Sequence, residues 1–203
     1  MTGHLDGFND RFLAHAKLAI VFDPSSTVYK KLRPALDAWV RGGGKLLIWD
    51  PLSRASEDSL LEGITFWADP SYRPSREFAY SSSPHPLLGG LSGTTVEATS
   101  LMPGMRAASS SWQELAYTVV SSSSEGIFAR PLETFGPRWT SIMDPARVPV
   151  ILAREYGAGT VIIAQLGVWR IHPKARMNPD RIQEAPPHLR KLAENLVNWA
   201  NKP

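Results

Sequence analysis

The chain has 203 residues, 43% of them hydrophobic and 20% charged, and it has no cysteine. This composition is typical of one globular domain, and the missing cysteines exclude disulfides, thiolate metal sites and a cysteine nucleophile. The formal net charge of +3, from 22 basic and 19 acidic side chains, is too small an excess to indicate a nucleic-acid-binding protein.

No membrane segment is expected. The longest apolar run, residues 161–166, is far shorter than the ~20 residues that span a bilayer. Residues 1–17 have no apolar core of the kind found in signal peptides. The sequence therefore predicts a soluble chain without a signal peptide, and it leaves the compartment undetermined.

A strand, a helix and a second strand are predicted between residues 17 and 51. The apolar runs 18–22 and 45–49 show no alternation, which is typical of strands buried on both faces. The helix between them has an apolar stripe formed by Leu32, Leu36, Trp39 and Val40. Glycines 42–44 end this helix, because glycine readily adopts the left-handed conformation that closes one.

The rest of the chain predicts shorter elements. Residues 5–16 form a short helix with an apolar stripe of Leu5, Phe8, Phe12 and Leu13, and residues 52–62 form another. Residues 148–154 and 160–166 are strands around a glycine-containing loop, which predicts a hairpin. Pro186 and Pro187 open a final helix. Further short strands are predicted at 65–68, 78–81, 96–98, 116–120 and 127–129.

Three segments and the final helix resemble one known superfamily. They are FDPSSTVYKKLRPALDAWVRGGGKLLIWDP at 22–51, SPHPLLGGL at 83–91, REYGAGTVIIAQLG at 154–167 and LRKLAENLVNWA at 189–200. This pattern resembles the class I glutamine amidotransferase-like superfamily, in its non-amidotransferase branches: the ThuA-like proteins and the middle domain of family 42 β-galactosidases. The resemblance implies a three-layer flavodoxin-like α/β domain with a mainly parallel central sheet, covering residues 1–203.

The sequence departs from the amidotransferase pattern at the nucleophile. Where the resemblance implies a cysteine between glycines, this chain has Trp49-Asp50-Pro51-Leu52. Such an elbow needs small neighbours, and proline cannot supply an oxyanion N–H. His172-Pro173-Lys174 is similar to the family's His-Pro-Glu, with lysine in place of the carboxylate. We therefore expect no glutamine amidotransferase activity.

A second departure concerns the start of the fold. Domains of this type open with a strand and helix before the segment equivalent to 18–22, and residues 1–17 contain no such strand. Either the chain is a fragment, or a fused or partner domain supplies the strand, or the sheet is reduced. An uncovered strand at 18–22 would favour a homo-oligomer joined at that edge, unless the 5–16 helix covers it.

Asp23 and Asp50 are the first candidate site residues, because ligands bind outside the carboxyl ends of parallel strands. The pair could bind a metal or share a proton; alternatively, each Asp-Pro simply turns the chain. Without a third ligand no metal site is expected, and no cofactor is predicted. His172 is a third catalytic candidate.

Ligand-binding candidates are His85, Trp169 and Arg170. Trp169 offers a stacking face and Arg170 a donor for a sugar or a small anionic ligand; the alternative is that His85 belongs to a rigid turn and the other two to an ordinary loop. Tryptophans outside the helix stripes are candidate sugar platforms: Trp49, Trp67, Trp112, Trp139 and Trp169.

Two functions follow from these observations. The first is a non-catalytic amidotransferase-like domain with a binding or assembly role in a carbohydrate-active system, where the carbohydrate part is implied only by the resemblance. The alternative is a hydrolase or isomerase that uses Asp23, Asp50 and His172 at the edge of the sheet.

Overall fold

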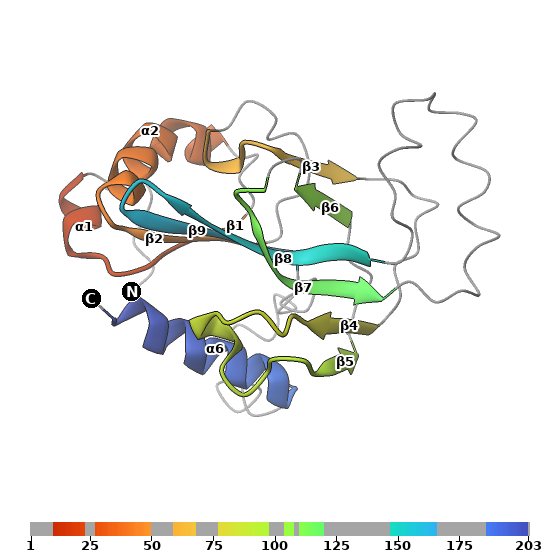
Figure 1. Cartoon of the computed structure of the whole chain (residues 1–203). Coiled ribbons are helices and arrows are strands. Elements are labelled where there is room, and N and C mark those ends of the chain that lie inside the picture. Colours follow the sequence, from red (N-terminus) through yellow and green to blue (C-terminus); the bar gives the residue numbers. More distant parts are fainter. Residues whose placement is uncertain are drawn as a thin grey trace, which may run out of the picture.

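The computed structural model shows a three-layer α/β arrangement (Figure 1). It describes residues 10–22, 27–49, 59–67, 77–97, 104–107, 110–119, 147–165 and 186–202. Within them, a seven-stranded sheet lies between helix α2 (Thr27–Arg41) and helix α6 (Pro187–Ala200). The flavodoxin-like α/β fold class predicted from the sequence is confirmed.

The three predicted apolar strands form one parallel block of the sheet. Strand β1 (Ala19–Phe22) pairs with β2 (Lys45–Trp49), and β2 pairs with β9 (Gly159–Ala164), both in parallel. The other strands extend this block in antiparallel fashion, in the order β8 (Arg147–Tyr156), β7 (Gln113–Val119), β4 (Glu77–Tyr80) and β5 (Thr95–Glu97). Strands β3 (Ile64–Trp67) and β6 (Gly104–Ala107) pair separately.

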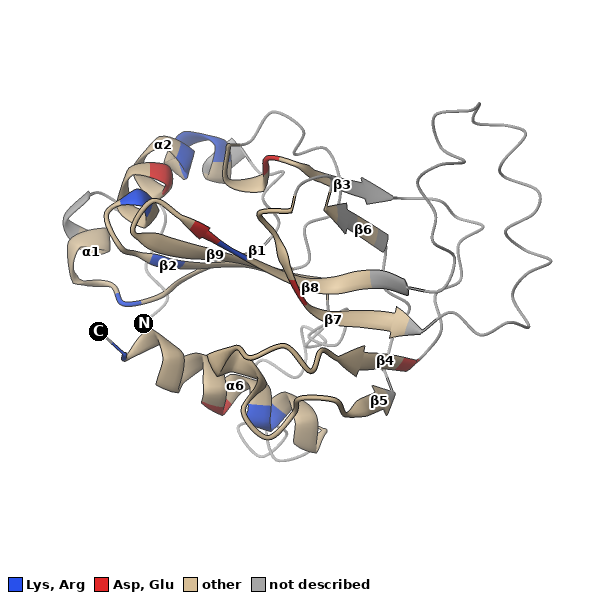
Figure 2. Cartoon of the chain, viewed as in Figure 1, with Lys and Arg blue, Asp and Glu red and all other residues tan. Residues whose placement is uncertain are grey.

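Each face of the sheet is covered by a different apolar cluster. Alternate residues of β2 point to opposite faces: Leu46 and Ile48 contribute to the cluster under α2, and Leu47 and Trp49 to the cluster under α6. Figure 2 shows most of the sheet as uncharged ribbon, with charged residues mainly on helices and turns. None of the described helices is long and apolar enough to cross a membrane.

Strand β1 lies at the edge of the sheet and pairs only with β2 among the described strands. The side chain of Ile20 is 45% exposed. The prediction that this strand is buried on both faces is therefore wrong at Ile20, because an apolar run does not distinguish a central strand from an edge strand.

The structure describes only part of the first predicted helix. Helix α1 spans Asp10–His15, and Leu5 and Phe8 lie outside the described residues. Leu13 is buried at 3% exposure, whereas Phe12 is 52% exposed. Of the two stripe residues that the structure describes, Leu13 is therefore part of the core and Phe12 is not. In the other predicted short helix, the structure describes one 3₁₀ turn at Ser59–Leu61, and residues 52–58 lie outside the described part.

The predicted hairpin is confirmed as β8 and β9 around Gly157 and Ala158. Its turn packs against the turn that follows α2: Ala158 N donates to Arg41 O at 2.9 Å, and Thr160 N donates to Gly44 O at 3.2 Å. Gly43 has a φ of 112°, as expected of the glycine that ends α2. These contacts hold α2, β2 and β9 together at the end of the sheet where β2 begins.

Candidate functional site

The carboxyl ends of the three parallel strands lie level with one another. Phe22 pairs with Trp49, and Trp49 pairs with Ala164, so β1, β2 and β9 end in one row. Asp23 and Asp50 follow the first two strands directly in the sequence. Both lie outside the described residues. The three candidates from the C-terminal half of the chain also lie outside them: Trp169, Arg170 and His172.

Gln165 follows β9 at this same edge, and the sequence analysis missed it. Its side chain is fully buried at 0% exposure, and within the described part of the chain neither amide atom has a hydrogen-bond partner. Its backbone N–H donates to Val150 O at 2.8 Å, which fixes the residue at the end of the sheet. A glutamine directly after the apolar run VIIA was the sequence signal available. Burial of such a group without partners is rare in native proteins.

His85 lies elsewhere, beside the last turn of α6. Its Nδ1 accepts a hydrogen bond from Leu87 N at 3.2 Å and caps the 3₁₀ turn Pro86–Leu88. The imidazole ring is 6.5 Å from the ring of Trp199, whose carbonyl oxygen accepts from Lys45 at the start of β2. These contacts explain His85 as a turn residue, and its ligand-binding role stays a prediction.

A second histidine is partly buried at the start of α6. The His188 ring lies 5.8 Å from that of Phe78 and 6.4 Å from that of Tyr80. His188 Nε2 and the Tyr80 hydroxyl are both buried, and neither has a hydrogen-bond partner in the part of the chain that the structure describes. Burial lowers the pKa of His188 and of His85, and it raises the pKa of Tyr80 far above its usual value.

The two partly buried histidines should make the stability of the folded protein sensitive to acid. Because burial lowers their folded-state pKa values, the unfolded chain binds more protons once the pH falls below about 6.5. The stability that depends on keeping these two histidines neutral is fully present above that pH. It is lost as the pH falls through their folded-state pKa values. Urea unfolding from about pH 7.5 to pH 5 should show this loss.

The matched variant for this prediction is the double substitution His85→Asn and His188→Phe. Asparagine can still cap the turn, and phenylalanine keeps the aromatic packing against Phe78 and Tyr80. The variant should lose less stability than the original protein over the same pH range. If the unfolding free energies of the two proteins changed equally with pH, these histidines would not be the source of the acid sensitivity.

The described tryptophans do not form a sugar platform at the carboxyl edge. Trp49 and Trp112 are only 9% and 6% exposed, so these two of the five candidate tryptophans offer no open stacking face. Trp49 belongs to the apolar cluster under α6, and Trp112 Nε1 donates to Glu62 O at 2.9 Å. The Trp67 side chain, Trp139 and Trp169 lie outside what the structure describes.

A polar cluster joins α2 to β8. Asp37 Oδ1 accepts from the Tyr156 hydroxyl at 2.6 Å and from Ser59 Oγ at 2.8 Å, and Asp37 Oδ2 accepts from Arg41 Nε at 2.8 Å. Burial acts to raise the pKa of Asp37, but these hydrogen bonds outweigh it, and the pKa lies below its usual value. Because both carboxylate oxygens are occupied, we interpret this cluster as a structural link rather than a catalytic site.

Comparison with known proteins supports the fold. No family pattern and no curated protein matches the sequence. The structure is similar to a ThuA-like protein from Bacteroides uniformis, with a TM-score of 0.59, 11% identity and coverage of 98% of this chain and 75% of that one. It is also similar to the cytoplasmic protein STM1381 from Salmonella typhimurium LT2, with a TM-score of 0.55, 10% identity and coverage of 95% and 75%.

A looser likeness exists to Gan42B, a GH42 β-galactosidase from G. stearothermophilus. Its TM-score is 0.46 at 13% identity, over 85% of this chain but only 21% of the β-galactosidase. A likeness of this degree supports no argument about function. The comparisons therefore establish a flavodoxin-like α/β fold that this chain shares with a ThuA-like protein.

Proposed function

We propose that this chain is a non-catalytic binding domain of the amidotransferase-like superfamily. Its ligand is a hydroxyl-rich molecule of the carbohydrate class, bound at the carboxyl edge of β1, β2 and β9. The carbohydrate class is proposed by analogy alone, because the sequence resembles the ThuA-like proteins and the middle domain of family 42 β-galactosidases.

The observation that carries this proposal is the buried amide of Gln165. Its Nε2 and Oε1 atoms have no hydrogen-bond partner among the residues that the structure describes, and an unsatisfied buried polar group costs about 1–3 kcal/mol. A primary amide donates and accepts at once, which suits it to a ligand hydroxyl group. The cost of burial is then offset when the ligand binds.

The position of the amide also supports the proposal. In open α/β sheets, ligands bind outside the carboxyl ends of the strands. Asp23 and Asp50 come next after β1 and β2 in the sequence, and carboxylates are strong acceptors for sugar hydroxyl groups. We assign them to the same ligand, and we expect no turnover of glutamine because the chain has no cysteine.

The substitution Gln165→Met separates binding from folding. Methionine is similar in shape and removes both orphan polar atoms, so the free energy of unfolding should rise by about 1–2 kcal/mol. Binding of monosaccharides such as galactose and glucose, measured by saturation-transfer NMR, should fall at least about tenfold. The exposed Gln113→Met is the matched control and should change neither quantity.

Two results would contradict the proposal. A less stable Gln165→Met protein would show that the amide has a structural partner, and unchanged sugar binding would place the ligand elsewhere. Hydrolysis of aryl glycosides by the original protein, lost in Asp50→Asn, would instead favour the hydrolase alternative.

A further inference from the structure

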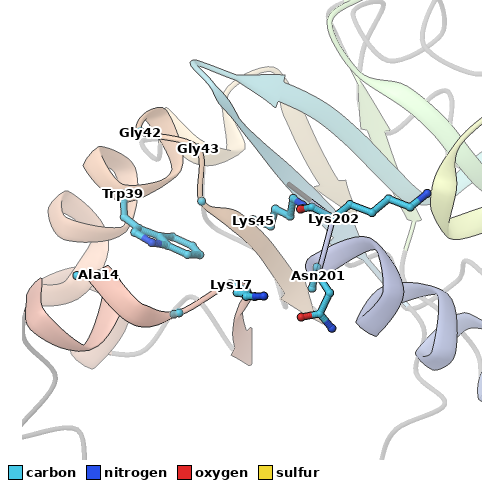
Figure 3. Close-up of a pocket in the computed structure, with 11 residues that line it drawn as sticks. Ala14, Lys17, Trp39, Gly42, Gly43, Lys45, Asn201 and Lys202 are labelled. Carbon is cyan, nitrogen blue, oxygen red and sulfur yellow. The ribbon is translucent and has the colours of Figure 1, made fainter.

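A separate pocket lies at the opposite end of the sheet, where β2 begins. Its volume is about 570 Å³, and its walls come from the α1–β1 connection, the turn after α2 and the last residues of α6 (Figure 3). The lining residues are Ala14, Ala16, Lys17, Trp39, Gly42, Gly43, Gly44, Lys45, Ala200, Asn201 and Lys202. Nothing in the carboxyl-edge proposal uses this pocket.

Trp39 supplies a flat apolar surface in the pocket. It belongs to the apolar stripe predicted for its helix, and its side chain is partly buried and lies along one wall of the pocket (Figure 3). A Cβ atom on Gly44 would lie 2.4 Å from the indole ring, so the ring rests directly against the glycine backbone. This contact holds the indole in one place, as a stacking surface requires.

The charged side chains that line the pocket are all lysines. Lys17, Lys45 and Lys202 all contribute to its lining, and none of the lining residues carries a carboxylate side chain. In Figure 3 the Lys17 side chain lies between Trp39 and Asn201, whereas Lys202 extends away from them. Lys17 and Lys45 are therefore the cations that a ligand resting on Trp39 would meet.

Lys45 donates hydrogen bonds to carbonyl groups at the end of α6, whereas Lys17 donates to neither helix end. Lys45 Nζ donates to Trp199 O at 2.9 Å and to Lys202 O at 2.7 Å, which uses two of its three donors. The last four carbonyls of α2 already accept from backbone N–H groups of residues 42, 43, 44 and 158. Lys17 makes no hydrogen bond or ion pair with any residue that the structure describes.

We propose that this pocket binds a small organic anion that carries a flat aromatic ring. The ring stacks on Trp39, and the anionic group, a carboxylate or a phosphate, lies between the ammonium groups of Lys17 and Lys45. Charge-assisted hydrogen bonds to an ammonium group are stronger than neutral ones, and an aromatic face adds packing that a bare anion cannot make.

The test is a titration of the full chain with phenyl phosphate, followed by ¹H–¹⁵N NMR at neutral pH and low ionic strength. The indole N–H of Trp39, identified with Trp39→Phe, and the amides of residues 42–44 should shift together. Inorganic phosphate and phenol should each bind at least about fivefold more weakly than phenyl phosphate. Lys17→Gln should weaken binding by about fivefold or more, and Lys17→Arg should retain it.

The exposed Lys30→Gln on α2 is the matched control for loss of one positive charge, and it should leave phenyl phosphate binding unchanged. Equal affinities for Lys17→Gln and Lys30→Gln would overturn the role of Lys17. Inorganic phosphate or phenol binding as tightly as phenyl phosphate would overturn the paired recognition of anion and ring, and so would the absence of shifts at Trp39. None of these readouts depends on Gln165 or on sugar binding.

Discussion

Replacing Gly159 with alanine is expected to lower the free energy of unfolding by more than about 3 kcal/mol, or to leave most of the molecules unfolded. A Cβ atom at this position would lie 2.1 Å from Val40 O and 2.2 Å from Gly44 O. Both atoms belong to the backbone at the end of α2 and its turn, and Thr160 N donates to Gly44 O at 3.2 Å. The hairpin cannot move away without breaking this junction, so little relaxation is available.

Gly42→Ala is the matched control for the glycine prediction. A Cβ atom there would meet its nearest neighbours, Ala38 O and Trp39 O, at 3.5 Å, which is ordinary van der Waals contact. Urea unfolding should place this variant within about 0.5 kcal/mol of the original protein. If Gly159→Ala were equally stable, the close approach of β9 to α2 would be refuted.

Replacing Asn195 with leucine should reduce the free energy of unfolding by about 2–4 kcal/mol. The Asn195 side chain is buried at 7% exposure, and its Nδ2 donates to Leu87 O at 2.9 Å and to Gly89 O at 2.8 Å. It thereby attaches the 3₁₀ turn to α6. Leucine fills a similar volume but leaves both carbonyl groups without their donor.

The matched control for this prediction is Asn198→Leu, since Asn198 lies on the same helix and is exposed. Its stability should change by no more than about 0.5 kcal/mol. Amide hydrogen exchange in residues 81–91 should accelerate in Asn195→Leu and not in the control. Similar unfolding free energies for the two variants would show that Asn195 does not anchor the turn.

The parallel block, the β8–β9 hairpin and α6 could be predicted from the sequence because their signals are local. Continuous apolar runs at 18–22, 45–49 and 160–166 have the length and character of strands. Glycine at 42–44 ends a helix through its own backbone freedom, and prolines at 186 and 187 are favoured at a helix start because the first turn needs no backbone N–H from them. Such preferences depend on neighbouring residues in the chain, so no tertiary contact is needed to recognise them.

The tertiary structure alone decided which apolar and polar side chains are buried. Ile20 and Ile48 both sit in apolar runs, yet Ile20 is 45% exposed and Ile48 is fully buried, because β1 lies at the edge of the sheet and β2 lies inside it. Gln165 is an ordinary polar residue in the sequence, and only its place at the end of β9 makes it a buried amide without a hydrogen-bond partner among the described residues. The pocket at the start of β2 is lined by residues from three separate segments, within 14–17, 39–45 and 200–202. Burial and pocket formation depend on segments distant in sequence that meet only in the folded chain, and local patterns do not specify which segments meet.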